Sequence, residues 1–219
     1  VILPAYPTCL ADALEDLDPQ KSIKIFYGIV CGLDECYKAG VAHLDLQPKN
    51  IYLTANGEQP LLSGFHSSLR WRSLKSTSMK VTEESPYRAP EITDPCGYSP
   101  FLADYWSLGV ILHVLMSHEY PEISGEDVLV NELDGGSGKE LCKTLLQINP
   151  RTRPPFLDYV LQHQLFSQNN IFANLRAPKK SKKKRGLTAR MQDAMSINHV
   201  SIPNISRKKR RSTRSSVKS

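Results

Sequence analysis

The chain has 219 residues, of which 40% are hydrophobic and 23% charged, a composition typical of an ordinary soluble domain. The longest apolar run, residues 108–116, is interrupted by His113 and falls well short of the roughly 20 residues that span a bilayer, so we expect no transmembrane segment. The five scattered cysteines include no C-x-x-C pair, which argues against a zinc site and favours reduced thiols in an intracellular protein.

The net charge of +6 is distributed unevenly along the chain. Residues 169–219 hold 15 of the 28 Lys and Arg residues and one of the 22 acids, whereas residues 1–168 hold the other 13 bases and 21 acids. We therefore expect two parts, an acidic folded body over residues 1–168 and a basic tail over residues 169–219. Low hydrophobicity with high net charge predicts that the tail is disordered.

The first elements of the body are a short strand and a long helix. Residues 1–7 are typical of the end of a strand that runs into a Pro-containing turn, and a short apolar-periodic stretch follows over residues 10–17. The pair Asp18-Pro19 is typical of a helix start, and Gly40 of a helix stop. Between them, apolar residues recur with spacings of 3 and 4, which predicts one face of a helix: Ile23, Phe26, Val30, Leu33 and Tyr37.

A hairpin and a long loop come next. Two short apolar runs, 51–53 and 60–62, flank the turn residues 55–57 and predict a β-hairpin. Residues 63–88 are polar and have no period, so we expect a long loop, which in a compact domain is usually functional. Three later segments have helical patterns, the first of them apolar on nearly every side: residues 102–117, 138–148 and 155–163.

The residues His43-Leu44-Asp45-Leu46-Gln47-Pro48-Lys49-Asn50 lie between the long helix and the hairpin. They resemble the catalytic loop of protein kinases, H-R-D-x-x-x-x-N. The resemblance implies that Asp45 stands at the position of the catalytic base, which accepts a hydrogen bond from the substrate hydroxyl. It also implies that Asn50 stands at the position of a metal ligand at the nucleotide phosphates.

Three further motifs follow in the order found in that family. They resemble the end of the activation segment, the start of the buried central helix and a later D-P-x-x-R-P segment: Ala89-Pro90-Glu91, residues 104–109 and residues 149–154. The resemblance implies an α+β protein-kinase-like fold over residues 1–168, a mainly helical large lobe with a short β-hairpin and the small lobe missing. It further implies a pair between Arg153 and Glu91, and structural roles for His43 and Asp104.

The metal-binding aspartate of the family's D-F-G triplet is absent. It stands thirteen residues after the Asn in that family, and here this position is Ser63. Magnesium is a hard cation held through carboxylates and phosphates, and a serine hydroxyl is a weak substitute. No Asp occurs between Asp45 and Asp94, so a shift in register does not restore the carboxylate.

Three companion changes affect the same site. Gln47 replaces the Lys that steadies the transferred phosphoryl group, and Leu44 replaces the Arg that senses a phosphate on the activation loop. Glu84 stands where a Thr or Ser normally bridges the catalytic Asp and that Lys. Because metal stabilisation of phosphoryl charge is worth several kcal/mol, losing the Asp and the Lys together is expected to cost on the order of 10³-fold in rate or more.

Three functions remain open from these residues. The first is a catalytically impaired pseudokinase that acts as a binding or scaffold domain for a protein partner. The second is a weakly active ATP-dependent serine/threonine kinase, since Asp45 and Asn50 are retained; ATP and magnesium are expected only if a small lobe lies upstream of Val1. The third is a polyanion-binding protein that acts through its tail.

The basic clusters of the tail and four histidines give weaker indications of function. Basic clusters at residues 179–185 and 207–211 are typical of nuclear targeting or of contact with nucleic-acid phosphates or an anionic membrane, so we expect the protein in the nucleus or cytoplasm. Four histidines have no second ligand at metal spacing, and we expect them in core or surface roles: His66, His113, His118 and His163.

Overall fold

The computed structural model describes residues 8–57, 59–71, 77–125, 127–130, 133 and 136–169. The chain divides into two units, residues 1–183 and 184–219, and every described residue lies in the first. The strand expected at residues 1–7 and, of the expected basic tail, residues 170–219 with both basic clusters lie outside the described residues. The elements in chain order are β1 (Thr8–Cys9), α1 (Leu10–Ala13), η1 (Leu14–Asp16), α2 (Pro19–Lys38), β2 (Val41–Ala42), η2 (Pro48–Asn50), β3 (Ile51–Leu53), β4 (Pro60–Leu62), η3 (Phe65–Ser67), β5 (Leu69–Arg70), η4 (Pro90–Thr93), α3 (Pro100–Ser117), β6 (Glu122–Ser124), β7 (Asp127–Leu129), α4 (Ser137–Leu145), η5 (Pro150–Thr152), α5 (Leu157–Leu161) and α6 (Gln164–Gln168).

Helix α2 begins and ends where the sequence predicts. The Asp18 side chain accepts a hydrogen bond from the Lys21 backbone N–H at 2.9 Å, which satisfies one of the free donors at the helix start. The helix ends at Lys38, and Gly40 then adopts a φ of +73°, a conformation that glycine reaches without a Cβ clash. The expected apolar face is buried along the length of the helix.

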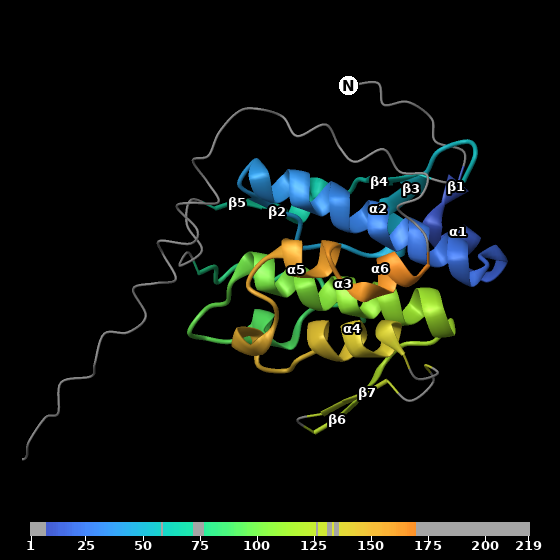
Figure 1. Ribbon diagram of the computed structural model, residues 1–219. Coiled ribbons are helices and arrows are strands. Elements are labelled where there is room, and N and C mark those ends of the chain that lie inside the picture. Colours follow the sequence, from blue (N-terminus) through green and yellow to red (C-terminus); the bar gives the residue numbers. More distant parts are fainter. Residues whose placement is uncertain are drawn as a thin grey trace, which may run out of the picture. The chain divides into compact units, whose positions relative to one another are not determined.

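The predicted hairpin is β3–β4, and β1 pairs antiparallel with the other edge of β3. Helix α2 packs on this sheet at β4 (Figure 1). The contact is close at Gly28, where an added Cβ would lie 2.6 Å from the ring carbons of Pro60. The sheet thereby sets the position of the loop that directly precedes β3.

Helix α3 forms the centre of the core and packs against α2 on one side and α4 on the other (Figure 1). Its 18 residues have a mean hydropathy of 1.2, so by length and composition the helix could cross a membrane, but 83% of it is buried inside the fold, as in a core helix. Helix α4 fits closely at Gly109, where an added Cβ would lie 2.7 Å from Leu146 Cγ. The buried helix expected from the sequence is thus confirmed.

Short elements that the sequence did not predict surround this core. The expected loop over 63–88 contains η3 and the strand β5, which pairs with β2, so the loop prediction is wrong there. Ser78 and Tyr98 form an isolated antiparallel bridge that ties the following segment to the body. The β6–β7 hairpin and helix α6 were also missed, because elements of two to five residues are too short to show a period.

Candidate active site

The loop from His43 to Asp45 is shaped by a carboxylate from α3. Asp104 accepts hydrogen bonds from the backbone N–H groups of His43 and Leu44, both at 2.7 Å, and from the Tyr37 hydroxyl at 3.2 Å. Leu44 has a φ of +63°, a left-handed conformation that costs a non-glycine residue about 1–2 kcal/mol. Two hydrogen bonds to the Asp104 carboxyl, each worth about 0.5–1.5 kcal/mol when it is neutral and about 1.5–3 kcal/mol when it is charged, offset that cost.

Burial changes the acid strength of Asp104. The residue is fully buried, and desolvation raises the pKa of its carboxyl from 3.8 to about 7, although the three donors favour the charged form. The structural role expected for Asp104 is to accept these three hydrogen bonds inside the core. Its carboxyl joins α2, the loop and α3 into one hydrogen-bonded unit.

His43 is held as a neutral imidazole. Its Nε2 lies 2.8 Å from the carbonyl oxygen of Ser63 and must donate there, while its Nδ1 accepts from the Asp45 backbone N–H at 3.2 Å. Burial lowers the pKa of the imidazole, in agreement with this pattern. His43 consequently connects the loop to the segment that follows β4, and its ring also packs on Phe65, with centroids 4.6 Å apart.

The Asp45 carboxylate is occupied on both oxygens. Gln47 Nε2 donates to Oδ1, and Asn50 Nδ2 donates to Oδ2 at 2.7 Å and to the Asp45 carbonyl at 2.8 Å. His66 Nε2 lies 3.3 Å from Oδ2. The sequence predicted that Asp45, Gln47 and Asn50 share a site, and the structure brings them together. In this arrangement the amides of Gln47 and Asn50 contact the carboxylate of Asp45.

Ser63 lies next to Asn50 but adds no carboxylate. Its backbone N–H donates to the Asn50 carbonyl at 2.9 Å, which places it where the count from Asn50 predicts. The next residue, Gly64, has a φ of +76° and lies so close to Asn50 that an added Cβ would be 2.5 Å from Oδ1. The amide of Asn50 is therefore covered by Gly64 on one side and bound to Asp45 on the other.

A magnesium ion does not fit these residues. Magnesium needs oxygen ligands in near-octahedral arrangement. Asn50 directs its amide nitrogen at Asp45, its amide group lies close to Gly64, and Ser63 offers a neutral hydroxyl. Within the described part of the chain, no three His, Cys, Asp or Glu side chains form a group that could hold a metal ion.

The expected pair between Glu91 and Arg153 is present. Arg153 donates from Nη1 to Glu91 Oε1 at 2.6 Å and from Nη2 to Oε2 at 2.9 Å, a bidentate pair. Both side chains are buried, and the guanidinium also donates to the Leu102 and Gln147 carbonyls and lies over the Trp106 ring. The pair fixes the end of the segment that contains Glu91 against α3 and η5.

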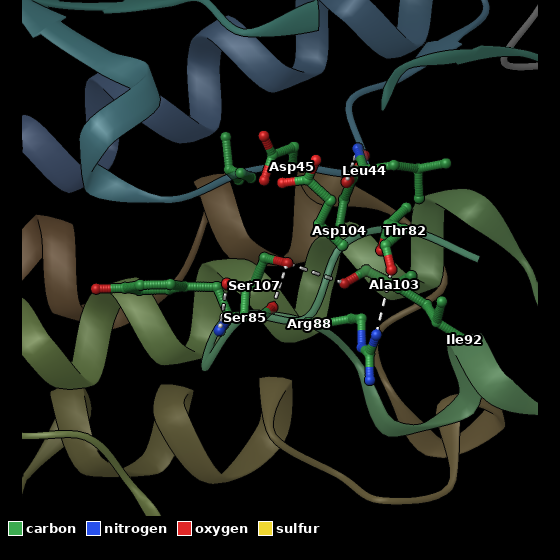
Figure 2. Close-up of a pocket in the computed structure, with 12 residues that line it drawn as sticks. Leu44, Asp45, Thr82, Ser85, Arg88, Ile92, Ala103, Asp104 and Ser107 are labelled. Carbon is green, nitrogen blue, oxygen red and sulfur yellow. Dashed lines mark hydrogen bonds between the residues drawn. The ribbon is translucent and has the colours of Figure 1, made fainter. Parts of the chain in front are cut away.

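Glu84 does not reach the catalytic-loop residues. Its side chain is 91% exposed, and its carboxylate lies 3.7 Å from Arg88 Nη2. Arg88 also donates to the Thr82 carbonyl at 3.2 Å, beside a small cavity whose wall includes Leu44 and Asp45 (Figure 2). The volume of this cavity, about 10 Å³, is at the lower limit for a single water molecule and too small for any larger ligand.

Three residues of the site were missed from the sequence. Tyr37 was predicted only as part of an apolar face, yet its hydroxyl binds Asp104. Gly64 directly follows Ser63 in the triplet that lacks its Asp and was given no role, and His66 was expected in a surface or core role. Contacts between residues 14 to 67 positions apart give no periodic or spacing signal, and only the fold brings them together.

Comparison with known proteins agrees with the motifs. Residues 6–166 match the protein kinase domain family. The chain is 32% identical over 149 residues to CBL-interacting serine/threonine-protein kinase 8 of Arabidopsis thaliana, with 63% of this chain and 33% of that protein covered. It is 36% identical over 152 residues to the Arabidopsis CBL-interacting serine/threonine-protein kinase 9, with 63% and 33% covered. To the Arabidopsis CBL-interacting serine/threonine-protein kinase 20 the chain is 29% identical over 168 residues, with 71% of this chain and 38% of that protein covered.

The chain therefore spans about a third of the length of these curated relatives. The family match covers the catalytic-loop residues, the central helix and the buried pair between Glu91 and Arg153. The chain belongs to the protein kinase domain family and is related to the plant CBL-interacting serine/threonine kinases.

Proposed function

We propose that this chain is the large lobe of a catalytically impaired pseudokinase that works as a binding or scaffold domain. The proposal rests on the contacts of the Asn50 side chain and on the missing carboxylate beside it. Its amide is bound to Asp45 and covered by Gly64, and the neighbouring Ser63 has no carboxylate to hold a metal. A kinase that lacks its metal site loses several kcal/mol of transition-state stabilisation.

The arrangement around Asp45 supports the same proposal. In an active site the carboxylate must be free to accept a hydrogen bond from the substrate hydroxyl. Here the Gln47 and Asn50 amides already donate to both of its oxygens. Oδ1 still has a lone pair that a substrate hydroxyl could use, but the missing Lys at position 47 leaves no cation at that point in the loop.

The test is phosphate transfer by the complete protein as it is made in the cell, in magnesium and in manganese, with generic protein substrates. We expect no transfer above that of the Asp45→Asn variant. Robust turnover that disappears in Asp45→Asn would overturn the proposal. Binding of protein partners should be unaffected by that substitution, because the fold is held by Asp104, Glu91 and Arg153 rather than by Asp45.

A weakly active serine/threonine kinase is the second candidate. It is favoured by the retained Asp45 and Asn50, and by relatives whose names describe serine/threonine-protein kinases. If this candidate holds, Ser63→Asp should raise the rate of transfer. The pseudokinase proposal expects no rise, since Gly64 still covers the Asn50 amide and Gln47 still replaces the Lys.

Partners and location are proposed from the sequence. A protein partner fits a scaffold role, and the basic clusters at 179–185 and 207–211 fit binding of nucleic acid or an anionic membrane, with a location in the nucleus or cytoplasm. The names of the relatives state an interaction with CBL, but only a third of their length is matched. We therefore propose a protein partner for this chain without assigning its identity.

A further inference from the structure

The β6–β7 hairpin extends away from the packed helices, below α4 in the view of Figure 1. Its two strands are held differently. Val128 of β7 packs against the core and Val130, directly after β7, is buried, whereas all three residues of β6 are exposed. Within the described residues, β6 pairs with β7 alone. β7 therefore attaches the hairpin to the body, and β6 forms its open edge.

The register of the hairpin turns the backbone of Ile123 outward. Ser124 pairs with Asp127 beside the turn, and Ile123 pairs with Val128. In an antiparallel ladder hydrogen-bonded and non-hydrogen-bonded pairs alternate, and the pair that closes a two-residue turn is hydrogen-bonded. The N–H and C=O of Ile123 consequently point away from β7. No other element of the described chain is bonded to them.

Exposed apolar side chains accompany this open edge. Ile123 is 55% exposed, and Tyr120, which lies shortly before β6, is 56% exposed. Tyr120 also contacts Tyr87 edge-on, with ring centroids 5.6 Å apart. An unpaired strand edge with an apolar side chain is a template for another extended chain. A Lys or Pro within the strand would oppose such pairing, and β6 contains neither.

The charges around the hairpin favour a basic occupant. Residues 119–138 contain six acids and no Lys or Arg. Three of the acids are described and exposed: Glu119, Glu122 and Asp127. In the described part of the chain none of these three forms an ion pair. A second copy of this chain or a nucleic acid would bring like charges together here, whereas Lys and Arg side chains are attracted.

We propose that β6 is a docking edge for an extended basic segment of a partner protein, in which Lys or Arg alternates with β-branched apolar residues. The segment hydrogen-bonds to the outward N–H and C=O of Ile123. Because alternate residues of β6 point to opposite faces, its apolar side chains pair with Ile123 on one face, and its cations lie beside Glu122 and Asp127 on the other. This docking edge rests on the proposed binding role, for which it supplies a surface and a class of partner.

The probe is a short fluorescein-labelled peptide in which Lys and Val alternate, and fluorescence anisotropy measures its binding to the full chain. We expect saturable binding. A second peptide has the same sequence but methylated backbone nitrogens at alternate positions, so it keeps the charge and loses the donors that face a strand edge. It should bind about tenfold more weakly, or not at all.

Ile123→Pro tests the same pairing from the side of the chain. The substitution removes the outward N–H, and Pro is tolerated on an edge strand where the N–H faces solvent. We expect it to weaken peptide binding about tenfold, because a carbonyl of the peptide loses its donor. Ile123→Thr is the matched control, since it keeps the backbone donor and the strand propensity, and it should weaken binding by less. The methylated peptide tests the pairing in the unaltered chain.

A pair of charge reversals tests the choice of a basic occupant. Glu122→Lys should weaken binding of the Lys-Val peptide about threefold or more. Glu15→Lys makes an equal change of charge at an exposed residue of η1 and should leave binding almost unchanged.

Docking at β6 is wrong if the peptide shows no saturable binding, if its methylated form binds equally well, or if Glu15→Lys has as large an effect as Glu122→Lys. Self-association of the chain that Ile123→Pro abolishes would make a second copy the occupant and would also overturn it. A missing peptide response leaves the proposal of impaired catalysis unchanged. Phosphate transfer in magnesium would overturn the impaired-kinase proposal and leave peptide binding as it stands.

Discussion

Asp104 is the residue whose ionisation is most closely tied to the shape of the site. Its carboxyl is fully buried, with a pKa of about 7 in the folded chain against 3.8 when exposed. Since the folded pKa is the higher one, the folded state binds the proton more tightly. This contribution to stability is complete below about pH 4 and is lost as the pH rises towards 7.

The variant Asp104→Asn does not titrate, so its comparison with the wild type isolates this effect. We expect the wild type to be the more stable at pH 5, and its advantage in unfolding free energy to shrink by about 2 kcal/mol between pH 5 and pH 7. Urea unfolding at several pH values measures this difference. A difference that stays constant over the range would show that Asp104 does not carry a raised pKa.

At the residue scale, the sequence predicted which residues belong to the site better than it predicted which residues contact one another. Ser63, thirteen residues after Asn50, lies beside it because the β3–β4 hairpin between them pairs Ile51 with Leu62. The contact of His66 with Asp45 and that of Tyr37 with Asp104 were not predicted. They depend on the tertiary positions of η3 and α2, which no local pattern encodes.

At the element scale, the Glu91–Arg153 pair joins η4 to η5 and α3. Arg153→Met leaves the Glu91 carboxylate buried without its cation, and we expect a loss of about 3–5 kcal/mol in the free energy of unfolding. Glu91→Leu combined with Arg153→Met should recover part of that loss, since neither charge remains buried alone. Urea denaturation of the two variants gives the values. A double variant less stable than Arg153→Met would contradict this account of the loss.

The packing of α3 against α4 depends on Gly109. In Gly109→Ala the new Cβ meets Leu146 Cγ at 2.7 Å and Leu145 Cβ at 2.9 Å, so we expect destabilisation by about 1–3 kcal/mol. Gly32→Ala in α2 is the matched control, because its Cβ meets the Leu62 side chain at 3.3 Å and alanine favours the helix. Thermal unfolding should separate the two variants clearly. Equal melting temperatures would show that α4 adjusts freely.

Long elements were predictable and short ones were not. In α2 the apolar spacing, Pro19 and the Asp18 cap agreed with one another, and the long apolar segment of α3 predicted a buried helix. β5, with two residues, and α6, with five, have too few positions for a period to appear. Their existence follows from the partners that the fold supplies, β2 for β5 and α4 for α6.

At the scale of the whole molecule, the charge asymmetry predicts separate roles for the body and the tail. The core of the described residues runs from Leu10 to Phe166. We expect deletion of residues 176–219 to leave the free energy of unfolding of the body unchanged. The same deletion should abolish binding to duplex DNA, used as a polyanion probe, whose affinity for the full chain should fall steeply with salt.

A deletion that spares both basic clusters, residues 186–206, provides the control for the tail. This segment contains one Arg and one Asp, so its removal leaves the net charge unchanged. DNA binding should persist in this variant. If the deletion of 176–219 also leaves DNA binding intact, the polyanion-binding role of the tail is wrong.

The backbone hydrogen bonds of Asp104 have a consequence for how such a domain can change over time. The carboxyl fixes the left-handed turn at Leu44 through main-chain N–H groups, so the turn does not depend on which side chains the loop carries. Substitutions at positions 44, 47 and 63 can then accumulate without unfolding the loop. Because a residue of α3 sets the shape of the loop, the side chains of the loop can change while the surface around it keeps its shape.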